Sequence, residues 1–574
     1  MKELIHTVRV KRALAALEKQ SFSSRLWDKD PTVWRQAGDG AKVIANRLGW
    51  LSLPTTMTPR IVEIGEFAEG VRVAGFTHVV LIGMGGSSLS PEVSRMTFGT
   101  NAGYPDLTVL DSTVPESLLE IDRRVDLART LFIVSTKSGT TVETLSAYRY
   151  FWDKLVSFKG KRACDNFVAI TDLGSPLDIE SKRRGFRRLF ANIPDVGGRY
   201  SALSYFGLVP AAVIGVNVNR LLQTGKGMAE KCAPSVPIRE NPGALLGVVL
   251  AEAALAGRDK LTLIASPEIA DFACWVEQLV AESTGKNGAG IVPIEGEPVG
   301  EPEKYGDDRL FIYFRLETSS DTKLNSTVDA LEEEGYHILR ISLADKYDLG
   351  REYFRWEMAT AVASALLGVN AFDEPNVKES NDNTNRLLAE FKASGNLADE
   401  QPVVKEGGIS LFCDGAVKGA IEKTISGSKR DLRSYLTAYL DLFQPGNYFA
   451  LMAFMHRTKE VDKLLQKVRA CLRDAYGAAT TAGYGPRFLH STGQLHKGGP
   501  NRGLFIQFTA DDAEDVAIPG ESYGFSVLKR AQALGDEIAL RSKGRPLIRL
   551  DLGKDAPSNL DKVAEIVHSA LEDR

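Results

Sequence analysis

Short apolar runs that alternate with helical stretches constrain the fold of this 574-residue chain more than any other feature. Four such runs begin near Thr77, Asp106, Arg129 and Asn166, and turn residues and then a helical pattern follow each of them. Continuous apolar runs of this length are typical of parallel strands that helices cover on both faces. The sequence therefore predicts an α/β fold with mainly parallel sheets, in which ligands bind beyond the carboxyl ends of the strands.

The same alternation returns twice further along the chain. A second block starts at Asp259, and the last block resembles it: "LFIYF" at 310–314 recurs as "LFIQF" at 504–508, and "ALEEEGYHILRISL" at 330–343 aligns without a gap with "ALRSKGRPLIRLDL" at 539–552. Any helix-glycine-strand unit can give matches of this kind, but we favour a partial duplication. We therefore expect a third α/β unit that is a partial repeat of the second.

These patterns divide the chain into four expected segments. The first is a peripheral helical segment whose start, "MKELIHTVRVKRALAALEKQ", reads as an amphipathic helix. A polar stretch at 392–408 looks like a linker before the last unit. The expected segments are an N-terminal helical segment at 1–60, a first α/β domain at 61–235, a second at 236–400 and a C-terminal α/β unit at 401–574.

Composition narrows the classes of function. The formal net charge is -4, so no basic field points to nucleic acid or to an anionic membrane. The five cysteines are widely spaced and odd in number, which suggests neither a disulfide framework nor a thiolate zinc site. No apolar run approaches membrane-spanning length, and the N-terminus lacks a signal-peptide core. We expect a cytoplasmic protein without a metal or other cofactor.

Two turns rich in glycine and hydroxyl groups predict a phosphate site. "GMGGSSLS" at 83–90 and "STKSGTT" at 135–141 each follow a predicted strand, and the second leads into a helix. Glycines let backbone amides approach an anion, and a helix N-terminus favours negative charge. Neither turn has the P-loop or the dinucleotide-binding spacing. A Gly-rich turn alone is as often only a tight turn, but the pair on neighbouring crossovers favours a bound phosphate.

Three other stretches carry candidate catalytic side chains. Arg199 follows two glycines in "DVGGRYSALS" and can stabilise developing oxyanion charge, although a surface arginine is the alternative. Glu282 ends an apolar helix, where partial burial raises a carboxyl pKa and suits proton transfer; a solvated terminal glutamate is the alternative. His490 and His496 lie in a Gly-rich loop without metal-ligand spacing, and a structural role is equally compatible with that loop.

Together, these motifs resemble the phosphoglucose isomerase family. "GMGGSSL", "STKSGTT", "VGGRYS", "AESTGK" and "GVNAFDEPNV" stand in the family's order between about 83 and 381, and "GYGPRFLHSTGQLHKGGPNRG" with "FSVLKRAQALGD" is similar to the isomerase part of fused transaldolase–phosphoglucose isomerases. The resemblance implies sugar-isomerase (SIS) domains, which are three-layer α/β/α sandwiches. It also implies interconversion of glucose 6-phosphate and fructose 6-phosphate through a cis-enediol, with no cofactor.

The resemblance assigns roles to residues of this sequence. Glu282 would move the proton between C1 and C2, and Arg199 would stabilise the enediolate. The residues that would hold the substrate phosphate are Gly86, Ser87, Thr136, Lys137, Ser138 and Thr141.

Two departures from the family pattern affect ring opening. The family's FDQ-x-GVE-x-x-K run reads "FDEPNVKESN" here, so Asn381 replaces the lysine that assists ring opening. Lys378 lies one helical turn earlier, on about the same face of a helix, and we hypothesise that it substitutes. The family's HSxGQ histidine is absent before that run, yet "LHSTGQ" occurs at 489–494. We expect His490 to return to the site from the third unit.

Other functions stay open at this point. A regulatory phosphosugar-binding protein without turnover would need the same cradle but not Glu282. A dual glucose and mannose 6-phosphate isomerase would differ only in details of its pocket. The family usually dimerises, so a homodimer is possible, whereas no nucleic-acid or membrane partner is suggested.

Overall fold

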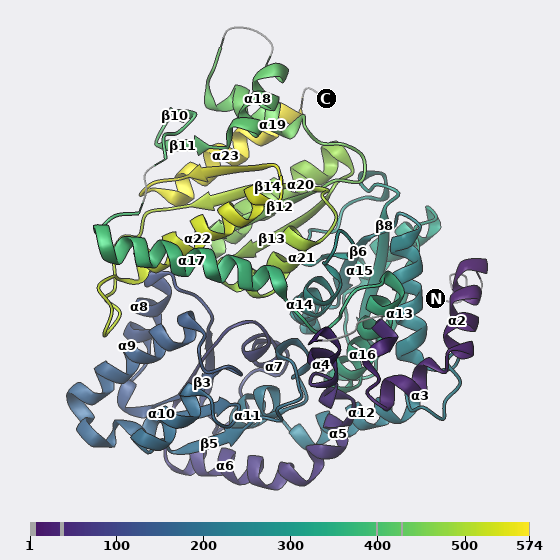
Figure 1. Cartoon of the computed structure of the whole chain (residues 1–574), viewed down its shortest axis with the longest axis vertical. Helices are drawn as coiled ribbons and strands as arrows, with labels where there is room; N and C mark the ends of the chain where they lie inside the picture. Colours follow the sequence, from purple (N-terminus) through teal and green to yellow (C-terminus); the bar gives the residue numbers. More distant parts are fainter. Residues whose placement is uncertain (1–6, 35–38, 398–399, 426–428, 573–574) are drawn as a thin grey trace.

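A computed structural model describes residues 7–34, 39–397, 400–425 and 429–572 (Figure 1). Its N-terminal part consists of short helices: α2 (Val8–Lys19), α3 (Phe22–Trp27), α4 (Asp39–Ala45) and α5 (Leu53–Thr56). The predicted amphipathic helix is α2, which buries Val10, Ala13, Leu14 and Leu17 on one face. No helix among the described residues is both long and apolar enough to cross a membrane.

The first sheet is entirely parallel, and its strands follow the predicted apolar runs. Its order is β2-β1-β3-β4-β5, with β1 (His78–Gly83), β2 (Asp106–Leu110), β3 (Thr130–Ser135), β4 (Phe167–Thr171) and β5 (Arg188–Ala191). The helices of this part of the chain are α6 (Ile61–Val73), α7 (Leu89–Phe98), α8 (Pro115–Arg124), α9 (Val142–Lys159), α10 (Pro176–Arg184), α11 (Tyr205–Val213) and α12 (Val218–Lys231).

The second sheet is also parallel and has the order β7-β6-β8-β9. Its strands are β6 (Lys260–Ala265), β7 (Val292–Ile294), β8 (Arg309–Leu316) and β9 (Ile338–Leu343). The accompanying helices are α13 (Pro242–Leu255), α14 (Phe272–Thr284), α15 (Thr322–Glu333), α16 (Leu349–Leu367) and α17 (Pro375–Ser394).

The third sheet is mixed, with the order β10-β11-β15-β14-β12-β13. Strands β12 (Tyr448–Phe454), β13 (Ala479–Tyr484), β14 (Gly503–Thr509) and β15 (Leu547–Asp551) are parallel, whereas β10 (Val404–Glu406) and β11 (Ile409–Phe412) join one edge antiparallel. Its helices are α18 (Gly415–Thr424), α19 (Leu432–Leu440), α20 (Lys459–Tyr476), α21 (Thr492–Gly498), α22 (Phe525–Ser542) and α23 (Ala556–Leu571). The α/β fold with mainly parallel sheets is therefore confirmed.

All three sheets contain the same arrangement of four successive strands. In each, the first strand lies between the second and the third, and the fourth lies beyond the third. The similar sequences found above correspond to β8 with β14 and to β9 with β15, which occupy equivalent positions. Because the first sheet has the same arrangement, the partial duplication stays a prediction, as do the four segment boundaries.

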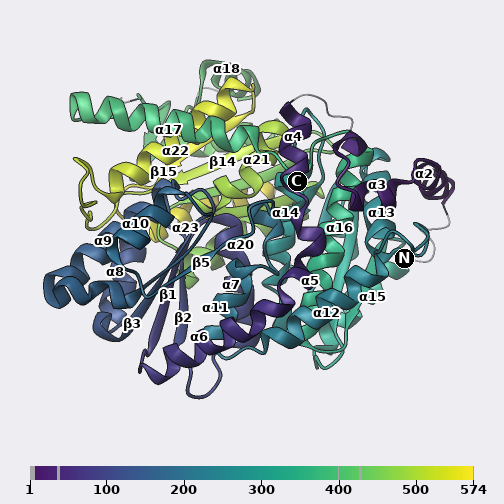
Figure 2. The same ribbon diagram turned by 60° about the horizontal axis from the view of Figure 1, so that its bottom comes forward.

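The third unit packs across the first and not only against its neighbour in sequence. Helix α17 runs alongside α22 (Figures 1 and 2). Leu387 and Leu388 of α17 share a core with Phe525 and Leu528 of α22 and with residues of β1 and β3. This packing brings the loop before α21, which carries His490, to the carboxyl edge of the first sheet.

Candidate active site

A cavity of about 430 Å³ lies at the carboxyl ends of β1 and β3. It contains all the predicted phosphate ligands and three of the four predicted catalytic residues. From those predictions, the lining residues are Gly86, Ser87, Thr136, Lys137, Ser138, Thr141, Arg199, Glu282 and His490. Most of the predicted site residues therefore lie together at the edge of the sheet where parallel α/β proteins bind ligands.

The glycine turn after β1 lies against the loop that carries Arg199. Gly86 belongs to the 3-10 turn η4 (Gly85–Ser87), and a Cβ atom at Gly86 would lie 2.0 Å from the carbonyl oxygen of Gly198. Gly85 has φ +55°, in the region that favours glycine. The two glycines therefore permit close packing of this turn against the main chain of Gly198 and Arg199.

Replacing Gly86 with alanine should destabilise the protein and disturb the cavity. The added methyl group would meet a main-chain oxygen that cannot rotate away, so we expect a loss of about 3 kcal/mol in the free energy of unfolding. Thermal unfolding would measure it. Gly70→Ala is the matched control, because Gly70 is in α6 with no atom within 4 Å of the added Cβ. Equal unfolding temperatures of the two variants would contradict the packing argument.

The hydroxyl-rich turn after β3 forms the other side of the cavity. The Oγ1 atoms of Thr136 and Thr141 lie 2.9 Å apart, and α9 begins directly after Thr141. The ammonium group of Lys137 donates to Asp172 at 2.6 Å and to the carbonyl of Pro194 at 2.8 Å. Burial lowers the pKa of Lys137. Hydroxyl groups, a lysine and a helix N-terminus together make an anion cradle.

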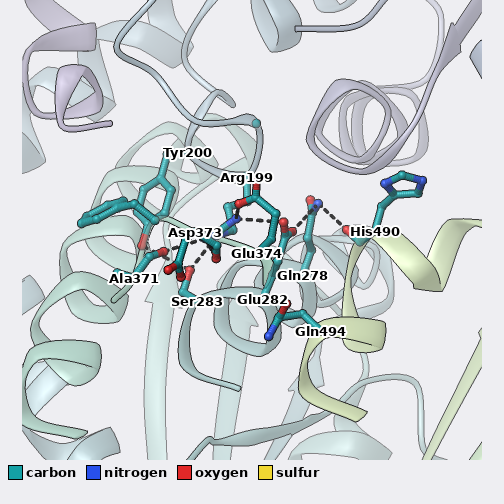
Figure 3. Close-up of polar contacts among 12 residues, drawn as sticks. Arg199, Tyr200, Gln278, Glu282, Ser283, Ala371, Asp373, Glu374, His490 and Gln494 are labelled. Atoms are coloured by element: carbon teal, nitrogen blue, oxygen red, sulfur yellow. Dashed lines mark hydrogen bonds and ion pairs between the residues drawn. The ribbon is translucent and has the colours of Figure 1, made fainter. Parts of the chain in front are cut away.

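Arg199 is buried at the centre of the site, so the surface-arginine alternative is wrong. Its side chain is 5% exposed, and its guanidinium group makes five hydrogen bonds of 2.7 to 3.1 Å (Figure 3). The acceptors are the side chains of Ser283, Glu282 and Glu374 and the main-chain carbonyls of Ala371 and Asp373. Hydrogen bonds to residues 282–283 and 371–374 fix the plane of the guanidinium group, and its positive charge partly neutralises the carboxylates of Glu282 and Glu374.

Glu282 also faces the cavity rather than bulk water, which excludes the solvated-glutamate alternative. The residue is 8% exposed and lies in the last turn of α14. Burial raises the pKa of its carboxyl group, and the ion pair with Arg199 at 2.8 Å opposes that rise. Gln278, one turn earlier, donates to the other oxygen at 3.1 Å. The carboxylate is thus held in one orientation and is more basic than an exposed one.

His490 reaches the same cavity from the third unit, as expected. Gln278 donates to the main-chain carbonyl of His490 at 2.7 Å, and the imidazole ring points away from that contact (Figure 3). The Nε2 atom of the ring lies 3.0 Å from the Glu143 carboxylate. Burial acts to lower the pKa of His490, but Glu143 raises it above the ordinary value. The other loop histidine, His496, is buried among aromatic rings and does not line the cavity.

The His490–Glu143 pair should stabilise the fold only within a window of pH. The raised pKa of His490 stabilises the folded protein fully below 6.5, the pKa of an unfolded histidine, and this stability is lost as the pH rises through the folded pKa. Burial acts to raise the pKa of Glu143, but His490 lowers it. The Glu143 carboxyl therefore stabilises the fold above 4.5, its unfolded pKa, and loses this contribution as the pH falls through its folded pKa. The unfolding temperatures of the wild type and Glu143→Gln, compared from acid to alkaline pH, should therefore differ most between these values. A constant difference would contradict the ion pair.

Lys378 does not enter the cavity, so the hypothesis that it replaces the family lysine is wrong on this geometry. Its side chain is 81% exposed, and its ammonium group lies 3.8 Å from Asp382. The positions of α17 that line the cavity are Val377 and Asn381, one turn apart. Each residue of a helix is rotated by about 100° from its neighbour, which turns Lys378 away from the stripe that includes Val377.

Lys378→Ala should consequently change turnover by less than about twofold, in the range of surface substitutions. The measurement is kcat with fructose 6-phosphate, the substrate that the resemblance in sequence implies, alongside Lys137→Ala as a variant inside the cavity. A large loss on removal of Lys378 would show that α17 rearranges when substrate binds.

Several side chains of the site were missed by sequence reasoning. Glu143 lies two residues after the hydroxyl-rich turn and is 4% exposed, and it also accepts a hydrogen bond from Gln532 at 2.8 Å. Gln278 precedes Glu282 by four residues on one helix face, which is a signal that could have been used. The partner of Glu143 lies 347 residues away, so no local pattern could have identified that pair.

The site has no arrangement that indicates a protein-bound metal. Among the described residues, no group of three or more His, Cys, Asp or Glu side chains is placed to hold a metal ion.

Comparisons with known proteins agree with this arrangement. The phosphoglucose isomerase family model matches residues 35–295. A glucose-6-phosphate isomerase of Carboxydothermus hydrogenoformans is 29% identical over 59% of this chain and 85% of its own length, and a probable glucose-6-phosphate isomerase of Methanococcus maripaludis is 26% identical over 59% and 83%.

Two solved structures have a similar fold. A hypothetical protein of Thermus thermophilus gives a TM-score of 0.57 at 25% identity, covering 67% of this chain and 97% of its own. A glucose-6-phosphate isomerase of Chlamydia trachomatis gives 0.54 at 20% identity, covering 67% and 87%. The matched motifs and the relatives therefore agree: residues 35–295 of this chain match the phosphoglucose isomerase family, and the chain is similar to glucose-6-phosphate isomerases along most of their own length.

Proposed function

We propose that the protein interconverts glucose 6-phosphate and fructose 6-phosphate through a cis-enediol. The observation that carries the proposal is that a buried carboxylate, Glu282, and a hydroxyl-rich anion cradle line one cavity of about 430 Å³. That volume suits a six-carbon sugar phosphate. The names of the relatives support the same substrate pair.

Substrate binding is assigned to the two turns at the sheet edge. The phosphate would lie between Ser87 and the turn from Thr136 to Thr141, where hydroxyl groups and the N-terminus of α9 offer hydrogen bonds and positive charge. Lys137 adds a cation, which already forms an ion pair with Asp172. The cradle fixes one end of the sugar and leaves its first two carbons towards Glu282.

Proton transfer is assigned to Glu282. Its carboxylate would take the proton from C1 of fructose 6-phosphate, which is acidified by the neighbouring C2 carbonyl. A proton would pass from O1 to O2 in the enediol, and Glu282 would return a proton to C2 to give the aldehyde at C1. Arg199 would stabilise the negative charge that develops on oxygen in the enediolate. Gln278 is a positioning residue because it holds the carboxylate through its second oxygen.

Ring opening is assigned to His490, with Glu143 as its positioning partner. Glu143 holds Nε2, and the structure shows no contact for Nδ1 among the described residues. The raised pKa keeps the ring protonated to higher pH, so it can donate a proton to the ring oxygen as the C–O bond breaks. Because every residue of this scheme comes from one chain, the proposal does not need a second subunit; the possible homodimer stays a prediction.

A phosphosugar-binding protein without turnover is not favoured. Burying the Glu282 carboxylate costs free energy of folding, and a protein that only binds the sugar phosphate has no need of a buried carboxylate at this position. No feature of the cavity favours mannose 6-phosphate in particular. The five cysteines form no disulfide, which suits the reducing cytoplasm that we also propose as its location.

The function can be tested with a coupled assay. Fructose 6-phosphate is supplied, and glucose 6-phosphate formation is read through a dehydrogenase. The proposal predicts turnover by the wild type at a rate far above background, and Glu143→Gln should retain part of it. Binding of fructose 6-phosphate without turnover by the wild type would favour the regulatory alternative and would overturn the proposal.

A further inference from the structure

A second pocket, of about 410 Å³, lies at the opposite edge of the first sheet from the candidate active site. It is bounded by residues that immediately precede β1, β3, β4 and β5 and by the C-terminal end of α9. Strands β1 and β3 extend from this edge to the cradle over six residues each, which is about 20 Å. The pocket is therefore separate from the cavity described above.

Positive charge dominates this pocket. Four cationic side chains line it: Arg129, Lys159, Arg162 and Arg187. Asp165 is the one carboxylate among its lining residues, and it is 3.4 Å from Arg162. Burial and then the charge of Arg162 lower the pKa of Lys159. Such a concentration of like charge attracts an anion.

The three guanidinium groups are held in a way that leaves their outer ends free. The described hydrogen bonds use Nε in each case: Arg129 to the carbonyl of Gly75 at 3.2 Å, Arg187 to the carbonyl of Asp165 at 2.6 Å and Arg162 to the Asp165 carboxylate. No described residue accepts a hydrogen bond from their terminal Nη groups. Those groups provide the paired donors that phosphate oxygens match best.

Aromatic rings border the cationic groups. Phe158 is 53% exposed at the rim, and the Arg187 guanidinium lies 5.0 Å from the ring of Phe76. An exposed ring beside anion donors suits a ligand that has both phosphate groups and a planar organic part. The pocket volume is within the range of small-molecule sites.

We propose that this pocket binds an organic diphosphate, with its phosphate groups between the arginines and its organic part against Phe158. Nothing in this proposal depends on the reaction assigned to the active site. Arg162 is the residue to remove, because its side chain is 87% exposed and its loss leaves the core unchanged. Arg183, 66% exposed and paired with Glu180 in the same domain, is the matched control.

Isothermal titration calorimetry with ADP at low ionic strength tests the proposal. We expect Arg162→Ala to weaken ADP binding about tenfold, as loss of a charge-assisted contact does, and Phe158→Ala to weaken it as well. Arg183→Ala should bind as the wild type does. Lys137→Ala removes the cation of the cradle and should leave this binding intact, which separates the two anion sites.

Three outcomes would overturn the proposal. One is that the wild type binds no ADP at about 1 mM. Another is that Arg162→Ala and Arg183→Ala bind ADP equally well. The third is that Lys137→Ala abolishes the binding, because ADP would then occupy the active-site cradle. Thermal unfolding of each variant verifies that the comparison is made between folded proteins.

Discussion

Glu282→Gln should lower kcat for fructose 6-phosphate about 10³-fold, because general acid–base groups contribute factors of that size. The amide keeps the shape of the side chain but cannot accept the C1 proton. Arg199 would keep its other acceptors, including Glu374 at 3.1 Å, so the cavity should stay folded. Glucose 6-phosphate should still bind, since the cradle is untouched.

The measurement combines steady-state turnover with calorimetric binding of glucose 6-phosphate. Glu277→Gln is the matched control: this neighbouring carboxyl of α14 has a pKa raised to about 8, chiefly by burial, but does not line the cavity. It should keep nearly full activity. If Glu282→Gln retained more than about a tenth of the wild-type kcat, the proton-transfer role would be rejected.

His490→Asn should have the second largest effect, a fall in kcat/KM of about 10²-fold with the cyclic substrate. The asparagine cannot donate a proton to the ring oxygen as a protonated imidazole does. The loop that carries the residue should keep its place, because Gln278 contacts its main-chain carbonyl and not its ring.

Glu143→Gln distinguishes a positioning role from a structural one. Without the carboxylate, burial would dominate and the pKa of His490 would fall. In a plot of kcat/KM against pH, the fall in activity that accompanies loss of the histidine proton should therefore move to lower pH. The double variant His490→Asn, Glu143→Gln should have the same kcat/KM as His490→Asn alone. An unchanged profile would show that Glu143 only supports the fold.

Much of the architecture was predictable because local chemistry dictates it. The apolar runs of β1, β3 and β4 are buried along their length, and such runs followed by turns identify parallel strands. Sequence reasoning did not single out β5, which has four residues, or β12, whose continuous apolar run is equally compatible with a buried helix. Antiparallel β10 and β11 were missed because a three- or four-residue strand leaves little pattern.

The residues that line the cavity differ in how far the local sequence predicts them. Gly86, Thr141 and Glu282 lie on turns and a helix end whose chemistry is visible locally. Lys378 was wrongly predicted to enter the site. It lies three residues before Asn381, but Val377 and Asn381 define the face of α17 that lines the cavity, and Lys378 is on another face. The partnership of Glu143 with His490 depends on the third unit folding across the first, and no periodicity encodes such a contact.

The most direct test of the central claim is isomerisation of fructose 6-phosphate in D2O, followed by NMR. If Glu282 removes the C1 proton and returns a proton to C2, solvent deuterium should enter C2 of the glucose 6-phosphate that the wild type forms, and both product and exchange should disappear in Glu282→Gln. Glucose 6-phosphate formed at an undiminished rate by that variant, with the same deuterium content, would contradict the account.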